Sequence, residues 1–432
     1  MENTRCLSLR IRQARGNSIV RILIVTQYFH PEPFRINDLA LALHAKGHQV
    51  TALTGMPNYP QGHIYPGYGW FSPHRDDYQG IAIVRVPSLS RGGQKNWRLF
   101  LNFLSFAVSA CVLGPLWCRQ KFDIVLAYQP SPVTVGLPGM LMGKLNSAPV
   151  LLWIQDLWPE TLAAVGQHGP LSLAATWIAN FVHRGCDKLL VQSEAFTQPL
   201  IARGVAAARI RYLPNWAEDF YRQGNAAAVA DPRGQCQGTR LLFAGNLGTA
   251  QSVETIIEAA HLLKHRPDIH WVFVGEGIMR KWVEEQIRLR QLDATVTLLN
   301  RRPPEDMPAL FSRADALLVT LRRDPVFRMT IPSRIQSCLA SGVAILGALD
   351  GEGARIIRQA QAGLVANAQD APGLAQCALQ MAAMTQTERA AMGLRGREYF
   401  DSHFSRDKLI GQLETWMHEL METRHADSDT WR

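Results

Sequence analysis

Short β-rich runs alternate with helical patterns along this 432-residue chain, and the alternation occurs twice. In the first half, apolar and β-branched runs are bounded by polar residues or glycine, and between them Ile36, Leu39 and Leu43 recur at helical spacing. Strand alternating with helix is typical of parallel sheets covered by helices on both faces. A chain of this length suits two domains of about 200 residues each. The sequence therefore predicts an α/β fold with two doubly wound sheets.

The expected strands share this short apolar character. In the first half they are 21–26, 49–54, 81–86, 123–127, 149–154, 187–192 and 209–213. In the second half they are 240–244, 270–274, 295–299, 315–319, 343–346 and 363–365. An amphipathic pattern from Ser405 to Leu420 predicts a last helix, which we expect to lie across both domains.

Changes in composition mark the expected domain boundaries. Residues 1–19 hold four Arg and no long apolar run, so we expect a disordered tail or an extension before the natural start. Residues 20–216 form the expected first domain. Residues 217–239, rich in Gly and Ala and without periodicity, read as a linker. Residues 240–400 form the expected second domain, and 401–432 the last helix and tail.

The positive charge of the chain lies in its first half. Residues 1–216 hold 20 basic and 10 acidic residues, whereas 217–432 hold 25 and 26. Such a half could face nucleic acid, an anionic membrane or an acidic ligand. Because no zinc-finger or helix-turn-helix pattern occurs, nucleic acid is the least favoured of the three.

The cysteines indicate neither a disulfide framework nor a zinc site. There are seven, an odd number, and no Cys-x-x-Cys pair occurs. We therefore expect a reducing cytoplasm as the location and no bound metal.

One uncharged segment complicates a purely soluble interpretation. Residues 99–118 carry no charge and lie between basic flanks, and their length would just span a bilayer. Asn102, Gly114 and Pro115 interrupt the segment, and the strand at 123–127 must still join the first sheet. We therefore expect a helix buried in the domain or packed on its surface, with a helix in the membrane interface as the alternative.

Two glycine-bearing loops follow expected strands in the second half. Gly245, Asn246 and Gly248 leave the strand at 240–244, and Gly275 and Glu276 leave the next one. Glycines in such loops let backbone N–H groups approach an anion. An ordinary tight turn between strand and helix is the alternative.

A third segment of the second half could also face an anion. It runs from Thr330 and Ile331 through Pro332 to Ser333, Arg334 and Gln336. Proline suits the first turn of a helix, where N–H groups, a hydroxyl and a guanidinium could converge on a phosphate. A plain capped helix with a solvated arginine is the alternative, but three such loops in one half favour anion binding.

Polar residues also follow strands in the first half. His30 and Arg35 lie in the loop after the first strand, and Asn58 lies after the second. Asp156 and Glu160 follow the strand at 149–154. Asp156 could act as a base or bind a hydroxyl, or it could simply cap the following helix; both interpretations stay open.

From residue 21 to about 420, the chain resembles the retaining glycosyltransferases of family 4, which have the GT-B fold. The resemblance is carried by the order and spacing of the run 21–62 and of the motifs Gln155–Glu160, Val191–Glu194, Pro214–Trp216, Gly245–Gly248, Val274–Gly277 and Ile331–Arg334.

The resemblance implies two Rossmann-like domains facing a cleft, with the last helix crossing back to the first domain. The second domain would bind a nucleotide sugar, usually a UDP-sugar, as co-substrate and without a fixed metal. The first would bind the acceptor. Asp156 and Arg334 are the candidate catalytic residues. The donor-side candidates are Gly245, Asn246, Gly248, Gly275, Glu276, Arg301, Arg328, Thr330, Ile331, Ser333 and Gln336, and the acceptor-side candidates are His30, Arg35, Asn58 and Glu160.

The chain departs from the family pattern in two places. Two glutamates that many members carry eight positions apart are replaced here by Arg328 and Gln336. The lysine that often follows the glycine loop is also absent. Arg334, Arg328 and Arg301 are the expected substitutes for that positive charge.

The resemblance implies a role in surface polysaccharide assembly, such as O-antigen, capsule or exopolysaccharide. The expected reaction is retaining transfer of a hexosamine or deoxyhexosamine, similar to N-acetylfucosamine, from a UDP-linked donor to a glycan or polyprenyl-linked acceptor. Such an enzyme would be cytoplasmic and peripheral at the inner membrane face. Two alternatives are a UDP-N-acetylhexosamine 2-epimerase on the same fold and a non-catalytic scaffold that binds nucleotide sugars.

Overall fold

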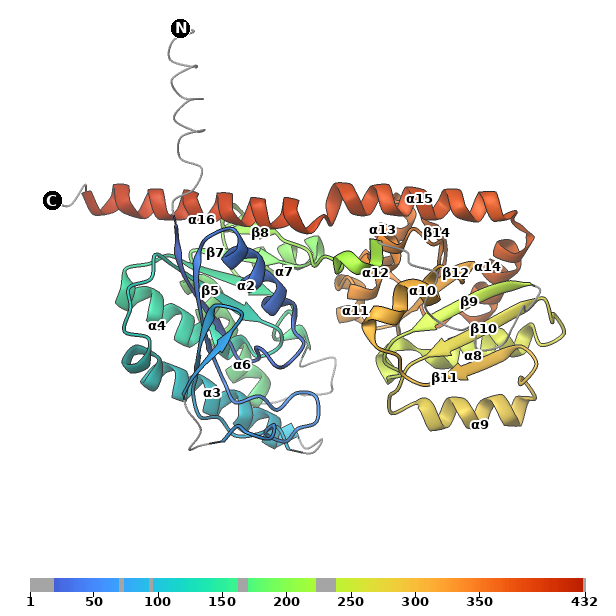
Figure 1. Cartoon of the computed structure of the whole chain (residues 1–432), viewed down its shortest axis with the longest axis horizontal. Coiled ribbons are helices and arrows are strands. Elements are labelled where there is room, and N and C mark those ends of the chain that lie inside the picture. Colours follow the sequence, from blue (N-terminus) through green and yellow to red (C-terminus); the bar gives the residue numbers. More distant parts are fainter. Residues whose placement is uncertain (1–18, 70–73, 93–95, 162–169, 223–237, 430–432) are drawn as a thin grey trace, which may run out of the picture. The chain divides into compact units, whose positions relative to one another are not determined.

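The computed structural model describes residues 19–69, 74–92, 96–161, 170–222 and 238–429 (Figure 1). Nearly all of the expected tail and most of the expected linker fall outside these ranges. The chain splits into two compact units, each with its own sheet. The first unit consists of residues 1–191, 197–213 and 410–432, and the second of 192–196 and 214–409. The short segments 192–196 and 214–216, which we expected in the first domain, therefore group with the second.

The sheet of the first unit is parallel except at one edge. In the described part of the chain its order is β3-β4-β2-β1-β5-β6-β7-β8. Its central strands are fully buried, which explains their unbroken apolar sequences. The strands are β1 (Arg21–Thr26), β2 (Gln49–Thr54), β3 (Arg75–Tyr78), β4 (Ile81–Arg85), β5 (Ile124–Gln129), β6 (Val150–Ile154), β7 (Lys188–Val191) and β8 (Ile210–Tyr212).

Strand β3 is the one strand of this sheet that the sequence did not predict. It pairs antiparallel with β4 at the edge of the sheet through a turn at Gln79 and Gly80, both with positive φ. Its residues Arg75, Asp76 and Asp77 are exposed. A charged edge strand carries no apolar alternation, and charge at an edge discourages pairing with other chains.

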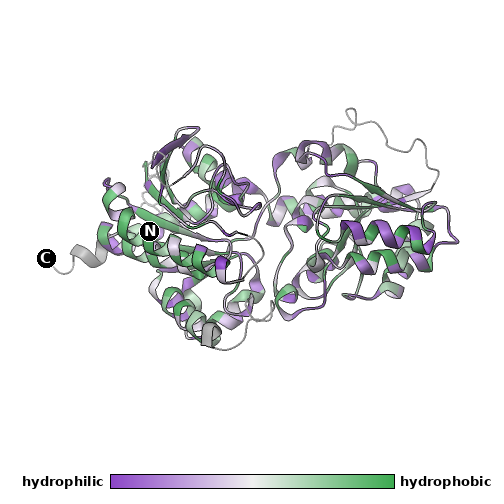
Figure 2. Ribbon diagram, turned by 90° about the horizontal axis from the view of Figure 1, so that it is seen from below, coloured by the Kyte–Doolittle hydropathy of each residue, from purple (hydrophilic) through white to green (hydrophobic). Residues whose placement is uncertain are grey.

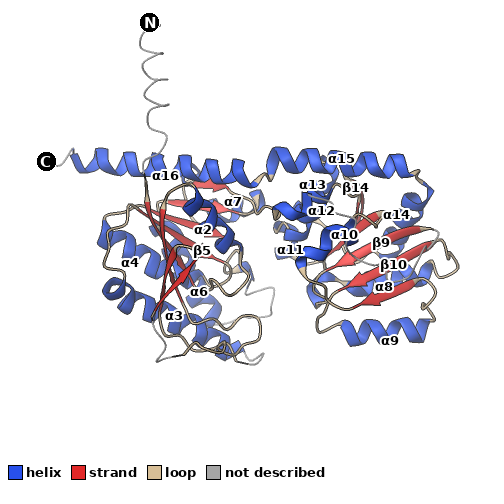
Figure 3. Cartoon of the chain, in the orientation of Figure 1, coloured by secondary structure: helices blue, strands red, loops and turns tan. Residues whose placement is uncertain are grey.

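The helices of the first unit connect successive strands (Figure 3). They are α2 (Arg35–Ala45), α3 (Asn96–Trp117), α4 (Gly136–Asn146), α6 (Pro170–Gly185) and α7 (Thr197–Ala202), with short 3-10 turns η1 (Val133–Val135) and η3 (Ala207–Arg209). The turn η2 (Glu194–Phe196) groups with the second unit. Helix α3 takes the place of the uncharged segment, and α4 packs against both α3 and α6.

The sheet of the second unit is entirely parallel, with the order β11-β10-β9-β12-β13-β14 in the described residues. Its apolar residues form one core between the sheet and helices α8 and α14, and green gathers inside each unit in Figure 2. The strands are β9 (Thr239–Ala244), β10 (Ile269–Val274), β11 (Val296–Leu299), β12 (Ala316–Thr320), β13 (Ile345–Ala348) and β14 (Gly363–Ala366). The helical segments are η4 (Asp219–Arg222), η5 (Thr249–Gln251), α8 (Val253–Leu262), α9 (Arg280–Arg290), η6 (Pro304–Asp306), α10 (Met307–Phe311), α11 (Pro325–Met329), α12 (Ser333–Ser341), α13 (Gly351–Gln359), α14 (Ala371–Ala383) and α15 (Gln386–His403).

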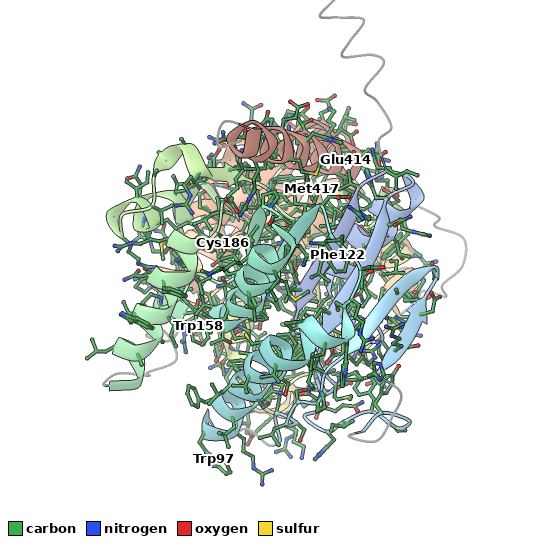
Figure 4. All side chains as sticks on the ribbon, turned by 90° about the vertical axis from the view of Figure 1, so that its left-hand side faces the viewer. Trp97, Phe122, Trp158, Cys186, Glu414 and Met417 are labelled. Carbon is green, nitrogen blue, oxygen red and sulfur yellow. The ribbon has the colours of Figure 1, made fainter. Side chains whose placement is uncertain are left out.

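The last helix, α16 (Arg406–Asp429), starts in the second unit and belongs to the first from residue 410 onward. It is held there by Glu414, whose carboxylate lies 2.8 Å from Lys46 Nζ and 3.0 Å from His48 Nε2. Met417 and Glu414 lie at the top of Figure 4, where α16 covers the sheet. The expected return of the last helix to the first domain is confirmed, as is the α/β class.

Candidate functional site

Two glycine loops of the second unit lie side by side at the carboxyl ends of adjacent parallel strands. The loop after β9 and the loop after β10 bond through their backbones: Gly245 N–H donates to Val274 (2.9 Å), and Leu247 N–H donates to Glu276 (2.8 Å). A Cβ added to Gly275, where φ is +154°, would lie 1.9 Å from the Gly245 carbonyl oxygen. Glycine is therefore required here for the two loops to touch.

We call the two loops, residues 245–248 and 275–277, the double loop. It lies at the point where the strand order of the sheet reverses. Strand β9 has β10 on one side and β12 on the other. From β9 the sheet continues through β10 to β11 on one side, and through β12 to β13 and β14 on the other. The loop after β12 is also attached, because Arg322 N–H donates to the Ala250 carbonyl at 2.9 Å. In open α/β sheets, ligands bind at such a switch point, outside the carboxyl ends of the strands.

Arg334 brings a positive charge to the double loop. It lies on the first turn of α12, and its guanidinium lies 4.2 Å from the ring centre of Phe243. A Cβ on Gly245 would lie 2.3 Å from Arg334 Nη2, so the guanidinium occupies the space that the glycine leaves open. Burial lowers the pKa of Arg334. Within the described residues no carboxylate pairs with this guanidinium, which leaves its charge available to an anion.

The other predicted donor-side residues are only partly gathered here. Asn246 and Ser333 are exposed beside Gly245 and Arg334. Glu276 lies 3.5 Å from Arg280, and Gly248 is buried in the turn that leads to η5. Arg301 follows the edge strand β11, two places from β9 in the sheet.

The segment before α12 differs from the expectation. The Thr330 hydroxyl donates to the Val326 carbonyl at 2.9 Å, and Ile331 is buried. Gln336 is fully buried, and its amide nitrogen donates to the Pro332 and Ser333 carbonyls at 3.1 and 3.0 Å. In the described structure the side chain is therefore turned inward and tightens the start of its own helix, and the donor-side role expected of Gln336 stays a prediction. Arg328 is exposed on the last turn of α11.

The sequence did not single out Arg280, which holds the second loop in place. Its guanidinium donates to the Gly275 carbonyl (2.8 Å) and the Leu299 carbonyl (3.0 Å). It also contacts Glu284 at 3.1 Å. The spacing of Glu276, Arg280 and Glu284, four residues apart, was the available signal.

A cavity of about 440 Å³ lies on the other flank of the η5 turn, between α8, α9 and the start of α14. Its lining includes Glu254 and Glu258 as well as Arg290 and Arg322. Because Arg290 already pairs with Glu258, the cavity has no excess of positive charge for a diphosphate. The double loop is the better anion site.

In the first unit, Glu32 ties two loops together at the corresponding sheet edge. Its carboxylate is buried and accepts the backbone N–H groups of Asn58 (2.8 Å) and Tyr59 (2.7 Å). Burial raises the pKa of Glu32 to about 7, and the two N–H groups partly oppose that shift. Glu32 stood within a predicted loop but was not among the candidate residues.

Replacing Glu32 with Ala should destabilise the first unit. Two buried N–H groups would lose their acceptor, at a cost of about 1–3 kcal/mol for each donor left unpaired. Glu32→Gln keeps one carbonyl oxygen and should lose less. Urea unfolding of the full chain measures both variants, and equal stability of Glu32→Ala and the parent would contradict this role.

Asn58 serves the same loop network and is turned away from solvent. Its side-chain nitrogen donates to the Met56 carbonyl at 2.8 Å, and its side-chain oxygen accepts the backbone N–H of Arg91 at 3.2 Å. The side chain is 1% exposed. Asn58 therefore positions the loops, and its expected contact with an acceptor stays a prediction.

An aromatic cluster surrounds these loops. The rings of Tyr28 and Phe34 stack at 5.0 Å, and Phe34 lies 5.0 Å from Tyr59. The Arg91 guanidinium lies 5.1 Å above the Tyr59 ring. Phe34 and Tyr59 are only half-buried, so the cluster offers aromatic faces and a cation to a ligand. The residues of this cluster come from three loops that are far apart in the sequence, so local sequence patterns could not predict it.

The remaining acceptor-side candidates lie around these loops. His30 stacks on Tyr78 at 3.9 Å, and burial lowers its pKa. Burial raises the pKa of the Tyr128 phenol at the end of β5, and the nearby positive charge of Arg35, on the first turn of α2, partly opposes that rise. Glu160 forms an ion pair with Arg203, so its charge is already neutralised.

Asp156 stands at the end of β6 with its carboxyl half-buried. Its backbone carbonyl accepts the Gln129 side-chain N–H at 2.9 Å. The negative charge of its carboxylate adds to the rise in the pKa of Tyr128, which Arg35 partly opposes. Burial raises the pKa of Asp156 to about 7. A carboxyl group that titrates near neutrality suits proton transfer. The helix that Asp156 would otherwise cap falls partly outside the described residues.

The raised pKa of Asp156 should make the free energy of unfolding depend on pH. The folded pKa is about 7, against an ordinary value of 3.8. Because the folded state then binds the proton more tightly than the unfolded state, stability is lost as pH rises between these values. Asp156→Asn should therefore melt higher than the parent at pH 8, with a smaller difference near pH 4. Asp407→Asn, at a fully exposed site, is the control, and a pH-independent difference would contradict the shift.

Within the described residues, no group of three or more His, Cys, Asp or Glu side chains is arranged to hold a metal ion.

Comparison with known proteins agrees with this arrangement. A family model described as "Glycosyl transferase 4-like domain" matches residues 34–216, and one described as "Glycosyl transferases group 1" matches 238–384. "Putative colanic acid biosynthesis glycosyl transferase WcaI" of Escherichia coli K12 is 28% identical over 339 residues, which is 75% of this chain and 82% of that protein.

Solved structures share the fold. Sucrose-phosphate synthase from Thermosynechococcus elongatus superposes with a TM-score of 0.70 at 15% identity, over 94% of this chain and 100% of that one. Anabaena HepE in complex with UDP superposes with a TM-score of 0.66 at 15% identity, over 93% and 100%. The two domain models together cover most of the chain, and the protein belongs to the GT-B glycosyltransferases, with a glycosyl transferase 4-like domain followed by a group 1 domain.

Proposed function

We propose that this protein transfers a sugar from a nucleotide diphosphate donor to a glycan or lipid-linked glycan during surface polysaccharide assembly. The observation that carries the proposal is Arg334, which has no carboxylate partner among the residues that the structure describes and is packed on the Gly245 loop at the switch point of the second unit. A diphosphate is the ligand that such a site suits, because backbone N–H groups and a guanidinium both favour an anion.

The names of similar proteins support the details of donor and pathway. HepE has been solved with UDP and with UDP-glucose, and WcaI is named for colanic acid biosynthesis. We therefore propose a UDP-linked donor and an exopolysaccharide or O-antigen product. From the family resemblance we further propose a hexosamine or deoxyhexosamine as the sugar, and the cytoplasm, at the inner membrane face, as the location.

The proposed chemistry rests on stabilising the leaving group. As the glycosidic bond to the diphosphate breaks, negative charge grows on the phosphate oxygens. Arg334, the double-loop N–H groups and the start of α12 would stabilise that charge without a metal ion. Departure of the diphosphate on the face where the acceptor attacks would retain the anomeric configuration. Asp156 would accept or position the acceptor's hydroxyl proton.

The experiment is a turnover assay of the purified chain with a panel of UDP-sugars, with and without a polyprenyl-diphosphate glycan and with and without EDTA. We expect UDP release and a new glycosidic bond only when donor and acceptor are both present, with the donor's anomeric configuration retained and no loss in EDTA. Interconversion of the donor alone would instead indicate an epimerase. Tight UDP binding without turnover would indicate a scaffold.

A further inference from the structure

Helix α3 is fixed to the first unit by a polar inner face. Asn102 is fully buried: its oxygen accepts the Gln27 side-chain N–H at 2.6 Å, and its nitrogen donates to the Leu89 carbonyl. Ser105 Oγ accepts the Leu89 N–H at 2.9 Å. A Cβ on Gly114 would lie 2.9 Å from the Leu53 side chain. Asn102, Ser105 and Gly114, which interrupt the apolar segment, therefore serve packing.

The outer face of α3 is apolar and uncovered. Residues 97–117 are long and apolar enough to cross a membrane, yet only a third of the most apolar window is buried. The exposed side chains recur every three to four residues, so they form one stripe. Trp97 is 57% exposed and Val112 59%, and Trp97 stands at the outer end of the helix in Figure 4. The stripe consists of Trp97, Phe100, Leu101, Leu104, Val108, Val112 and Leu116.

Helix α6 carries a second stripe of the same kind, which the sequence analysis missed. Leu173, Trp177 and Phe181 are spaced four residues apart and are 73%, 70% and 48% exposed. The rings of Trp177 and Phe181 stack at 5.8 Å. Because α4 packs against both α3 and α6, the three helices form one layer. We call the outer surface of this layer the docking face.

The charge of the docking face is positive throughout. Helices α3, α4 and α6 contain no Asp or Glu, whereas Arg98, Lys144 and Arg184 are exposed on them. Between residues 85 and 155 the sequence has a single acidic residue, Asp123, and it pairs with Arg21 at 2.6 Å. Exposed apolar side chains combined with basic ones, without carboxylates, are typical of surfaces that bind anionic lipid.

We propose that the docking face binds an anionic membrane surface, with the α3 and α6 stripes lying in the interface and neither helix spanning the bilayer. Strand β4 before α3 and strand β5 after it belong to the same sheet, so the two ends of α3 cannot lie on opposite sides of a membrane. A symmetric pairing of two copies through this face would bring like charges together, which favours lipid as the occupant.

This surface extends the proposed function, since a lipid-linked acceptor would meet the enzyme there. Vesicle binding needs no catalysis, however, so its failure and a failure of the glycosyltransferase assay are separate results.

The test is flotation of the full chain with vesicles of phosphatidylcholine alone or mixed with phosphatidylglycerol, at low and high salt. Leu104→Gln/Val108→Gln/Val112→Gln removes the α3 stripe, and Leu173→Gln/Trp177→Gln/Phe181→Gln removes the α6 stripe. Ile278→Gln/Leu289→Gln/Leu394→Gln is the matched control, because these side chains are equally exposed but lie in the second unit.

We expect the parent chain and the control to float with anionic vesicles, more weakly at high salt because salt screens only the charge contribution. Each stripe variant should lose about tenfold or more in partitioning, since three apolar side chains leave the interface. Brominated lipid should quench the tryptophan fluorescence of the parent, and Trp97→Phe/Trp177→Phe should reduce that quenching while leaving the fold intact.

Three results would overturn the proposal. The parent could stay in the soluble fraction with both kinds of vesicle, or the stripe variants, folded by their melting curves, could float like the parent. Light scattering could show a dimer that the stripe variants abolish, in which case a second copy covers the face.

Discussion

Arg334→Ala should lower donor turnover by about 30- to 1,000-fold, equivalent to roughly 2–4 kcal/mol of transition-state stabilisation. The guanidinium lies against Gly245 and over the ring of Phe243, so the substitution removes a positive charge directly from the Gly245 loop. Because an uncompensated, half-buried cation costs folding free energy, removing it should leave the melting temperature unchanged or raise it. Steady-state release of UDP from the donor measures the effect.

Two further variants sharpen this prediction. Arg334→Lys keeps the charge but lacks the planar guanidinium that stacks on Phe243, so an intermediate loss is expected. Arg288→Ala removes an exposed arginine of α9 and should leave turnover unchanged. Near-normal rates in Arg334→Ala would remove this residue from the site.

Gly275→Ala should disable the double loop. The added Cβ would meet the Gly245 carbonyl oxygen at 1.9 Å, and φ of +154° is a conformation that alanine rarely adopts. Strain of this kind costs about 2–4 kcal/mol, and the loops must separate to relieve it. We expect a lower melting temperature together with the loss of UDP binding.

Gly411→Ala is the matched control for this substitution. It makes the same chemical change inside helix α16, where a Cβ meets nothing within 4 Å. There the smaller entropy of the unfolded chain should stabilise the protein by about 0.4–1 kcal/mol. If both variants behaved alike, the double loop would not depend on close backbone approach.

The strands could be predicted within about two residues because most lie in the sheet interiors and read as continuous apolar runs. Strand β3 escaped prediction because its residues face solvent at an edge. The double loop and Arg334 could be predicted from the sequence because their residue types have local roles. Glycine permits close approach of the backbone, proline suits the first turn of a helix, and arginine binds anions.

Residues whose roles depend on distant parts of the chain could not be predicted. Glu32 meets its partners 26 and 27 positions away, and Arg280 reaches the Leu299 carbonyl at the end of the neighbouring strand. Gln336 shows the same limit: the family pattern predicts a donor-side role, but its burial among the residues of α12 could not be read from the sequence. The α6 stripe was hidden because apolar residues occur around the whole helix, and only packing distinguishes its inner face from its outer one.

The most direct test of the diphosphate site is calorimetric titration of the purified chain with UDP and with uridine. The account predicts that the parent binds UDP much more tightly than uridine, and that Arg334→Ala loses most of this difference while its affinity for uridine is unchanged. An unchanged preference for UDP in Arg334→Ala would contradict the assignment of the Gly245 loop and Arg334 as the diphosphate site.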